Sequence, residues 1–185
     1  MTLLLLGGTF DPPHFGHLLL AECARHQFDA AQVAFLVAGE PWRKRDRAVT
    51  PAELRLAMTR LAVQANPAFI VDDREVARTG PTYTVETLAD LRAAGHDDIV
   101  LVLGADALAD LPNWREPDRI RALARLAVAP KPGAPAPSAG VEVIEMPPLA
   151  ISSTVIRERV KAGLPIRYLV PDAVAAFIAE HRLYR

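Results

Sequence analysis

Short runs of consecutive apolar residues alternate along the chain with longer segments in which apolar residues recur every three or four positions. The short runs have the length of buried strands, and the longer segments have the spacing of amphipathic helices. Strands that alternate with helices are typical of βαβ units, so the pattern predicts an α/β fold with an open parallel sheet and helices on both faces. Strands are predicted at Leu3–Leu6, Val33–Val37, Phe69–Val71, Ile99–Leu103, Leu126–Ala129 and Val141–Ile144.

The clearest helix start lies at residues 50–53. Thr50 and Glu53 have the spacing of a capping box, and Pro51 suits a first helical position, so a helix is expected from there to about Gln64. The Pro-rich segment 130–137 is interpreted as a surface loop, because an apolar strand pattern resumes right after it. Residues 1–185 are therefore expected to form a single domain. Helical spacing also predicts helices over 18–28, 85–91, 151–161 and 171–181.

Composition excludes several classes of protein. The 185 residues are 51% hydrophobic and 23% charged, which indicates a folded globular chain. The formal net charge of -1 provides no global field for nucleic acid or an anionic membrane, so any anion must be bound locally. The single cysteine, Cys23, rules out an intrachain disulfide and fits a reducing compartment. Without a basic leader or an apolar stretch of 18 residues, we expect a cytoplasmic protein.

The turn after the first predicted strand carries the densest candidate chemistry. Ligands of open parallel sheets bind beyond the carboxyl ends of the strands, where this turn lies. In the string over 7–17, glycines let the backbone or a ligand approach closely, and Gly16 does so at the start of the helix that follows. His14 and His17 would lie at the positive end of that helix and donate to phosphate oxygens. The spacings of a dinucleotide fingerprint and of a P-loop are absent.

Two other interpretations of these histidines stay open from the residues alone. Taken by themselves, His14 and His17 favour one loop and one helix histidine, each with its own hydrogen bonds. Asp11, His14 and His17 are also a candidate metal-ligand set, although the sequence offers no obvious source of further ligands.

The whole string over 7–17 closely resembles the G-x-F-D-P-x-H-x-G-H string of the nucleotidylyltransferase superfamily, which follows the first strand of a Rossmann-like fold. The resemblance implies that His14 and His17 bind the triphosphate of ATP. It also implies that three residues of the turn lie close to the nucleotides, namely Gly8, Thr9 and Phe10.

A second candidate anion site lies near the C-terminus. Ser152, Ser153 and Thr154 have the hydroxyl groups that cap helices, and Arg157 would fall in the first turn, where a cation opposes the helix dipole. A bound phosphate would reverse this conflict, whereas an Arg157 side chain in solvent or paired with a carboxylate would only tolerate it. The superfamily has a matching I-S-S-T-x-x-R string, which implies that residues 151–157, including Ile151, contact the ATP phosphates.

A third group of residues bears on the second substrate. Taken singly, Trp114 is compatible with a core residue and Asp106 with a helix cap. Together with the Thr-Tyr-Thr turn over 82–84, they resemble the bacterial nicotinate mononucleotide adenylyltransferases over nearly the whole chain. The resemblance implies that Gly104 and Asp106 lie against ATP. It implies contacts to the pyridine nucleotide from Thr9, Thr82, Tyr83, Thr84, Asp106 and Trp114.

The chain departs from that family after the second strand. Many members have Pro-Pro-His-Lys there, and this chain has Pro41-Trp42-Arg43-Lys44. Lys44 matches the family's lysine, which implies a catalytic role and a contact with the pyridine nucleotide. Trp42 and Arg43 replace the second proline and the histidine. Because the loop over 40–47 has few apolar neighbours, we expect Trp42 to be exposed and the loop to close on substrate.

The resemblance implies that the chain transfers the adenylyl group of ATP to nicotinate mononucleotide, giving deamido-NAD and pyrophosphate in NAD biosynthesis. His14, His17, Lys44 and Arg157 would act by neutralising charge, and Mg²⁺ would arrive with ATP, without ligands from protein side chains. The alternatives are an adenylyltransferase for pantetheine phosphate or nicotinamide mononucleotide, and a nucleotide-binding protein without turnover. We expect neither nucleic acid nor a membrane as partner, and a homo-oligomer remains open.

Overall fold

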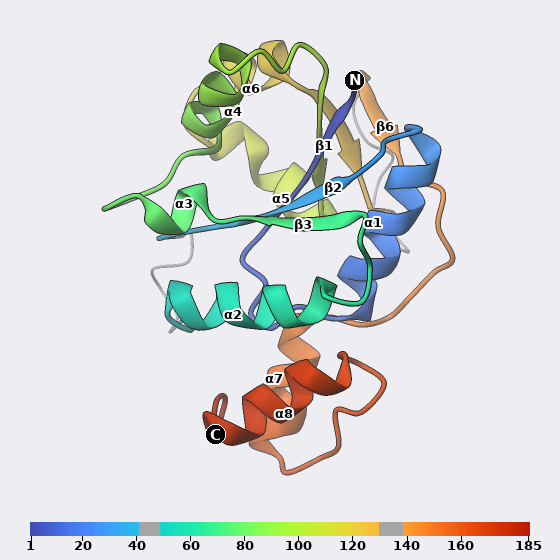
Figure 1. The fold of residues 1–185 in the computed structure, drawn as a ribbon, viewed down its shortest axis with the longest axis vertical. Helices are drawn as coiled ribbons and strands as arrows, with labels where there is room; N and C mark the ends of the chain where they lie inside the picture. Colours follow the sequence, from blue (N-terminus) through green and yellow to red (C-terminus); the bar gives the residue numbers. More distant parts are fainter. Residues whose placement is uncertain (41–48, 130–138) are drawn as a thin grey trace.

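The computed structural model describes residues 1–40, 49–129 and 139–185. Over these residues six strands form one sheet with the order β3-β2-β1-β4-β5-β6, and every neighbouring pair is parallel (Figure 1). The winding reverses between β1 and β4, and in open parallel sheets the ligand crevice lies beyond the carboxyl ends of the strands at such a reversal. The strands are β1 Leu3–Gly8, β2 Val33–Val37, β3 Phe69–Asp72, β4 Ile99–Leu103, β5 Arg125–Val128 and β6 Val141–Val143.

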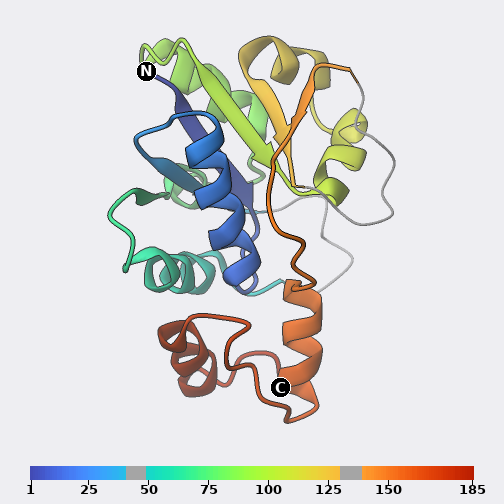
Figure 2. The same cartoon turned by 90° about the vertical axis from the view of Figure 1, so that its right-hand side faces the viewer.

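Helices cover both faces of the sheet, as the apolar pattern predicts (Figure 1). Helices α1 (Phe15–Gln27) and α2 (Ala52–Val63) lie on one face, and α4 (Thr84–Ala93) and α6 (Pro117–Leu123) lie on the other. The chain then descends from β6 to a C-terminal pair, α7 (Ser153–Lys161) and α8 (Asp172–Glu180), which lies below the sheet (Figure 2). The α/β fold with helices on both faces is confirmed.

The core consists of an apolar layer on each face of the sheet. Along β1, Leu4 and Leu6 point into the layer under α1 and α2, and Leu5 points into the layer under α4 and α6, because successive strand residues face opposite sides. Each such side chain contributes about 1.5–3 kcal/mol when fully buried. A third cluster joins Met58 of α2 to Ile156 of α7 and so attaches the C-terminal pair.

Two predicted helix starts differ from the structure. Helix α1 begins at Phe15, three residues before the predicted start, because His14 takes the N-cap position. The capping box at 50–53 does not form, since extended Pro51 is itself the N-cap of α2. Thr50 lies outside the helix, and its backbone N–H donates to Oδ2 of Asp11 at 3.4 Å.

Within the described residues, the sequence pattern missed four helices, and all of them are short. They have too few residues to show a helical period, which needs a window of about 11 residues. The predicted loop over 130–137 lies outside the described residues. The missed helices are α3 (Arg74–Ala77), α5 (Ala105–Asp110), the 3₁₀ helix η2 (Leu111–Asn113) and α6.

A buried arginine ties α2 to the carboxyl ends of β1 and β2. Arg55 is only 1% exposed, and its Nε donates to the Thr50 carbonyl at 2.8 Å. Its Nη1 donates to the carbonyls of Thr9 at 2.9 Å and Ala38 at 2.7 Å, and Nη2 donates to that of Gly39 at 2.7 Å. Burial lowers the pKa of Arg55. The guanidinium thus satisfies four carbonyls at the end of the sheet where the crevice opens.

We predict that Arg55→Leu lowers the free energy of unfolding by about 3 kcal/mol or more, because it leaves these buried carbonyls without donors. The matched control is Arg60→Leu on the same helix, where an exposed pair with Asp73 contributes at most about 1 kcal/mol. Urea denaturation of both variants measures the difference. Equal losses would show that the Arg55 contacts carry no special share of the stability.

Candidate active site

The turn after β1 has a strained backbone. Phe10 adopts a φ of 48°, which bulky residues rarely take. Residues in such strained conformations cluster at functional sites. Its ring is buried against Gly8, where an added Cβ would come within 2.7 Å of the ring. The sequence predicts nucleotide contacts for both residues, but the space beside Gly8 is filled by the Phe10 ring. The Phe10 side chain is thus a core residue.

The two histidines of the turn stack on each other. His14 is the N-cap of α1, and the centroids of the His14 and His17 rings lie 3.7 Å apart. The backbone N–H of His14 donates to Nδ1 of His17 at 3.2 Å. Because Nδ1 of His17 accepts this bond, its proton lies on Nε2, which makes Nε2 a hydrogen-bond donor.

His14 is 6% exposed, and burial lowers its pKa to about 4, so the ring is neutral at pH 7. Its buried Nδ1 has no hydrogen-bond partner within the part of the chain that the structure describes. Gly16 permits this packing, since a Cβ there would come within 2.9 Å of that nitrogen. The predicted close approach at Gly16 is therefore made by the His14 imidazole itself.

The second candidate anion site begins at the cap of α7. The Ser152 hydroxyl accepts the backbone N–H of Val155 at 3.2 Å, as predicted for a hydroxyl N-cap. Ile151 precedes this cap and packs against the C-terminal apolar cluster. Arg157 is the fifth residue of α7, just beyond the first turn in which we predicted it, because the helix begins at Ser153. The conflict with the helix dipole is correspondingly weaker.

Side chains of α7 hold the turn after β1. The Ser153 hydroxyl donates to the Pro12 carbonyl at 2.8 Å. Nη1 of Arg157 donates to the Asp11 carbonyl at 2.8 Å, and its Nη2 donates to the Thr154 hydroxyl at 3.2 Å. The Arg157 side chain is thus directed at the turn after β1. It is neither turned out to solvent nor, among the described residues, paired with a carboxylate, the two alternatives that the sequence left open. The structure thus brings together two strings that lie about 140 residues apart in the sequence.

The Thr-Tyr-Thr turn opens α4. Tyr83 is the N-cap and Thr84 the first helical residue. Thr82 is buried, and its hydroxyl bonds to the buried carboxyl of Glu75. Burial raises the pKa of Glu75, while bonds from Thr87 and Thr82 lower it. The turn is therefore anchored from beneath by Glu75.

Trp114 lies beside this turn. Trp114 and Tyr83 pack against the same apolar cluster, and Nε1 of Trp114 donates to Asp110 at 3.3 Å. The guanidinium of Arg115 lies 4.6 Å from the centroid of the Tyr83 ring, and Nη1 of Arg115 pairs with Glu86 at 3.0 Å. The structure thus brings the turn and the tryptophan segment together.

The turn after β4 lies at the same edge of the sheet as the turn after β1, because these strands are neighbours. Gly104 is the N-cap of α5, and Asp106 is an exposed residue of its first turn. The alternative in which Asp106 caps the helix is therefore wrong. Gly104 and Asp106 therefore lie beyond the carboxyl ends of β1 and β4, and their nucleotide contacts stay a prediction.

Some of the predicted site residues lie outside the part of the chain that the structure describes, and one alternative concerns a metal ion. Lys44, Trp42 and Arg43 lie outside the described residues. No three His, Cys, Asp or Glu side chains lie close enough to hold a metal over residues 1–40, 49–129 and 139–185, so the alternative with Asp11 and both histidines as metal ligands finds no support there. No helix in these ranges is long and apolar enough to span a bilayer.

Sequence reasoning missed Arg55 and Tyr184, and it considered the carboxylate of Asp11 only as a metal ligand. The hydroxyl of Tyr184 donates to Oδ1 of Asp11 at 2.7 Å, below the catalytic turn. A signal for Arg55 does exist in the sequence, since it falls on the apolar stripe of α2 with Met58 and Ala62. Nothing in the sequence pairs Tyr184 with Asp11, because 173 positions separate them.

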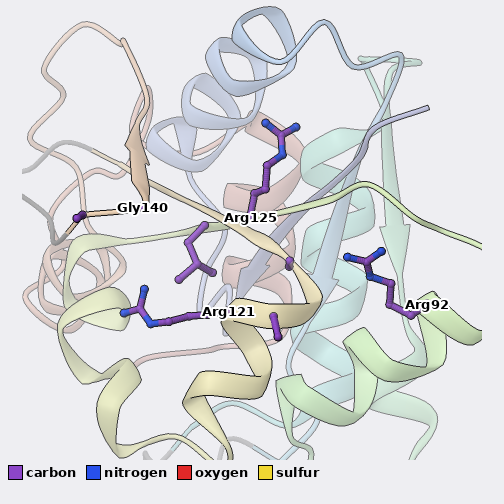
Figure 3. Close-up of a pocket in the computed structure, with 8 residues that line it drawn as sticks. Arg92, Arg121, Arg125 and Gly140 are labelled. Carbon is purple, nitrogen blue, oxygen red and sulfur yellow. The ribbon is translucent and has the colours of Figure 1, made fainter.

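A cavity of about 380 Å³ lies at the other end of the sheet, where Arg125 begins β5 (Figure 3). Its arginines do not converge, since Figure 3 shows Arg92, Arg121 and Arg125 pointing in different directions. Arg92 donates to the Leu123 carbonyl at 2.9 Å, and Arg125 pairs with Asp98 at 3.2 Å. This cavity is separate from the crevice and does not form an anion site.

The low pKa of His14 predicts a specific pH dependence of stability. The unfolded chain takes up the His14 proton near pH 6.5 and the folded chain only near pH 4, so stability is lost as the pH falls through this window. Between pH 7.5 and pH 5, wild type should lose about 2 kcal/mol more than His14→Gln. Denaturant midpoints at the two pH values measure this, and parallel losses would contradict a buried neutral His14.

Comparison with known proteins places these features in a family. A family model described as cytidylyltransferase-like matches residues 5–159. A protein of Roseiflexus sp. (strain RS-1) named probable nicotinate-nucleotide adenylyltransferase is 48% identical, covering 98% of this chain and 96% of its own length. A Streptomyces coelicolor protein of the same name is 46% identical, covering 97% and 99%.

The solved structure of Plasmodium falciparum nicotinic acid mononucleotide adenylyltransferase complexed with NaAD has a TM-score of 0.84 and 16% identity to this chain. The alignment covers 99% of this chain and 97% of that one, and it shows that the folds agree. The chain belongs to the cytidylyltransferase-like family and, within it, to the nicotinate-nucleotide adenylyltransferases.

Proposed function

We infer that this chain transfers the adenylyl group of ATP to nicotinate mononucleotide, giving deamido-NAD and pyrophosphate. The observation that carries the inference is the junction between the turn after β1 and the start of α7. Ser153 and Arg157 bond to the Pro12 and Asp11 carbonyls, so hydroxyls and a guanidinium lie beside two histidines at the switch point of the sheet. Such a set of donors suits a polyphosphate.

The reaction needs no nucleophile from the protein. A phosphate oxygen of nicotinate mononucleotide, already ionised at neutral pH, attacks the α-phosphorus of ATP. A new oxygen–phosphorus bond forms, the bond from the α-phosphorus to the bridging oxygen breaks, and pyrophosphate leaves with that electron pair. The chain contributes by aligning the two nucleotides and by stabilising the charge on the reacting phosphorus and the leaving group.

Each residue at the junction of the turn after β1 with α7 has its own role in aligning the nucleotides and stabilising the charge. His17 donates from Nε2, the nitrogen that carries its proton, to an oxygen of the reacting phosphate. Neutral His14 offers a hydrogen bond without adding charge to a buried position. Arg157 supplies positive charge, and its bonds to Asp11 and Thr154 hold the guanidinium in place while using two of its five N–H groups. Lys44 is proposed as a further cation.

Mg²⁺ enters this proposal as part of the substrate. The described donors near the turn are imidazoles, hydroxyls and a guanidinium, which bind phosphate oxygens and do not suit a hard cation. The one carboxylate of the turn, Asp11, already accepts bonds from Tyr184 and Thr50. The residues of the described turn therefore do not fit a protein magnesium site, and the ion arrives bound to the phosphates of ATP.

The start of α4 is proposed to receive the pyridine ring. Tyr83 and Trp114 provide aromatic surface there. The first backbone N–H groups of α4 have no partner within the helix and give its N-terminus a partial positive charge. A pyridine with a carboxylate gains more from that charge than one with a neutral carboxamide. The site therefore favours nicotinate over nicotinamide mononucleotide.

The test is pyrophosphate release from ATP in parallel reactions with nicotinate mononucleotide, nicotinamide mononucleotide and phosphopantetheine. We expect release with the first, weaker release with the second and none with the third. Faster release with phosphopantetheine would overturn the proposed acceptor. Nucleotide binding without release in any reaction would instead indicate a protein that has lost turnover.

We predict that His17→Ala lowers kcat by about 100- to 1,000-fold while changing the KM for nicotinate mononucleotide little, because the lost donor acts on the reacting phosphate. His26→Ala, an exposed histidine in the last turn of the same helix, is the control and should retain wild-type kinetics. Steady-state pyrophosphate release measures both variants. A near-wild-type kcat for His17→Ala would remove this residue from the mechanism.

A further inference from the structure

The chain returns to the catalytic turn at its end. Helix α8 ends at Glu180, and the residues after it reverse direction, with positive φ angles at Arg182 (52°) and Tyr184 (64°). Leu183 and Tyr184 pack against the apolar cluster that joins α2 to the C-terminal helices. This path directs the Tyr184 hydroxyl to Oδ1 of Asp11, at 2.7 Å.

Asp11 is held by three separate segments. Its carboxylate accepts from Tyr184 and, through Oδ2, from the backbone N–H of Thr50 at the entry to α2. Its carbonyl accepts from Arg157 of α7. Asp11 is 3% exposed, so its carboxylate has little access to water and depends on these donors. Through Asp11, the chain end, α2 and α7 all act on the turn that carries His14.

The Tyr184 phenol is suited to a permanent donor role. Burial and the neighbouring Asp11 carboxylate raise its pKa, so the hydroxyl keeps its proton throughout the physiological range. Its aromatic ring has apolar neighbours that would also hold a phenylalanine. The hydroxyl therefore has a task beyond packing. It is bonded to the Thr50 side chain and lies 4.0 Å from Sδ of Met58, and its bond to Asp11 at 2.7 Å is the one that reaches the turn after β1.

We propose that Tyr184 is a positioning residue, whose bond to Asp11 holds the turn after β1 and Arg157 in the geometry that adenylyl transfer requires. The proposal rests on the proposed function for its reaction. A buried carboxylate that loses its donor shifts toward other partners, and the turn shifts with it. Displacement of reacting groups by about 1 Å costs up to about 100-fold in rate.

The experiment compares Tyr184→Phe with Tyr168→Phe, which removes the same atom from a tyrosine that is 79% exposed. We expect Tyr184→Phe to lower kcat about tenfold while the KM for nicotinate mononucleotide stays within about twofold, because the start of α4 does not contact Asp11. Tyr168→Phe should match wild type. A Tyr184→Phe protein with wild-type kcat would overturn the proposal, even if it were less stable.

A second variant tests the same bond from its acceptor. Asp11→Ala removes the acceptor of the Tyr184 hydroxyl and should lower kcat at least as much as Tyr184→Phe does. The double variant should be no slower than Asp11→Ala alone, because Tyr184 then has no carboxylate left to bond. Losses that multiply would show that Tyr184 acts elsewhere and would overturn the proposal. If Tyr184→Phe does not fold, a wild-type kcat for Asp11→Ala overturns it equally.

A binding measurement separates this proposal from the proposed function. The rise in melting temperature on adding MgATP, without any acceptor, should be smaller for Tyr184→Phe than for Tyr168→Phe. If wild type released no pyrophosphate with any acceptor, the proposed function would fail, and the shift with MgATP would still decide the role of Tyr184. Equal shifts in the two variants would then contradict it.

Discussion

The geometry of the crevice depends on the buried guanidinium of Arg55. Parallel strands end with backbone carbonyls that no longer have a partner in the sheet, and here those carbonyls lie where the chain must turn toward the ligand. The guanidinium satisfies carbonyls after β1, after β2 and at the entry to α2. Its planar set of donors makes this arrangement possible, whereas a lysine has one nitrogen. These bonds therefore fix the backbone at the beginning of the turn that carries His14 and His17.

From this anchor, the site is assembled by bonds to the backbone of one turn. Ser153 and Arg157 hold the Pro12 and Asp11 carbonyls, and Tyr184 holds the Asp11 carboxylate. Buried His14 is neutral, whereas the guanidinium groups of Arg55 and Arg157 bring positive charge to the turn through the Thr9 and Asp11 carbonyls. This combination favours a polyphosphate over a free cation and agrees with a mechanism based on alignment and charge neutralisation.

Much of the fold was predictable from the sequence because strands such as Ile99–Leu103 are continuous apolar runs and α2 is long enough to show its period. The short helices were not predictable for lack of length. The strings around His14 and Arg157 predicted the candidate site, and the structure brings the two strings into contact. The contacts of Arg55 and Tyr184 were not predictable, because they join side chains to backbone atoms and carboxylates from distant segments.

The central claim is a direct in-line transfer between two nucleotides, without a covalent intermediate on the protein. ATP with a single sulfur on the α-phosphorus, in one defined configuration, tests it with the wild-type enzyme and nicotinate mononucleotide. One displacement inverts the configuration at phosphorus, so the account predicts a deamido-NAD thio analogue of inverted configuration. Retention would require two displacements and a nucleotidylated side chain, and it would contradict the account.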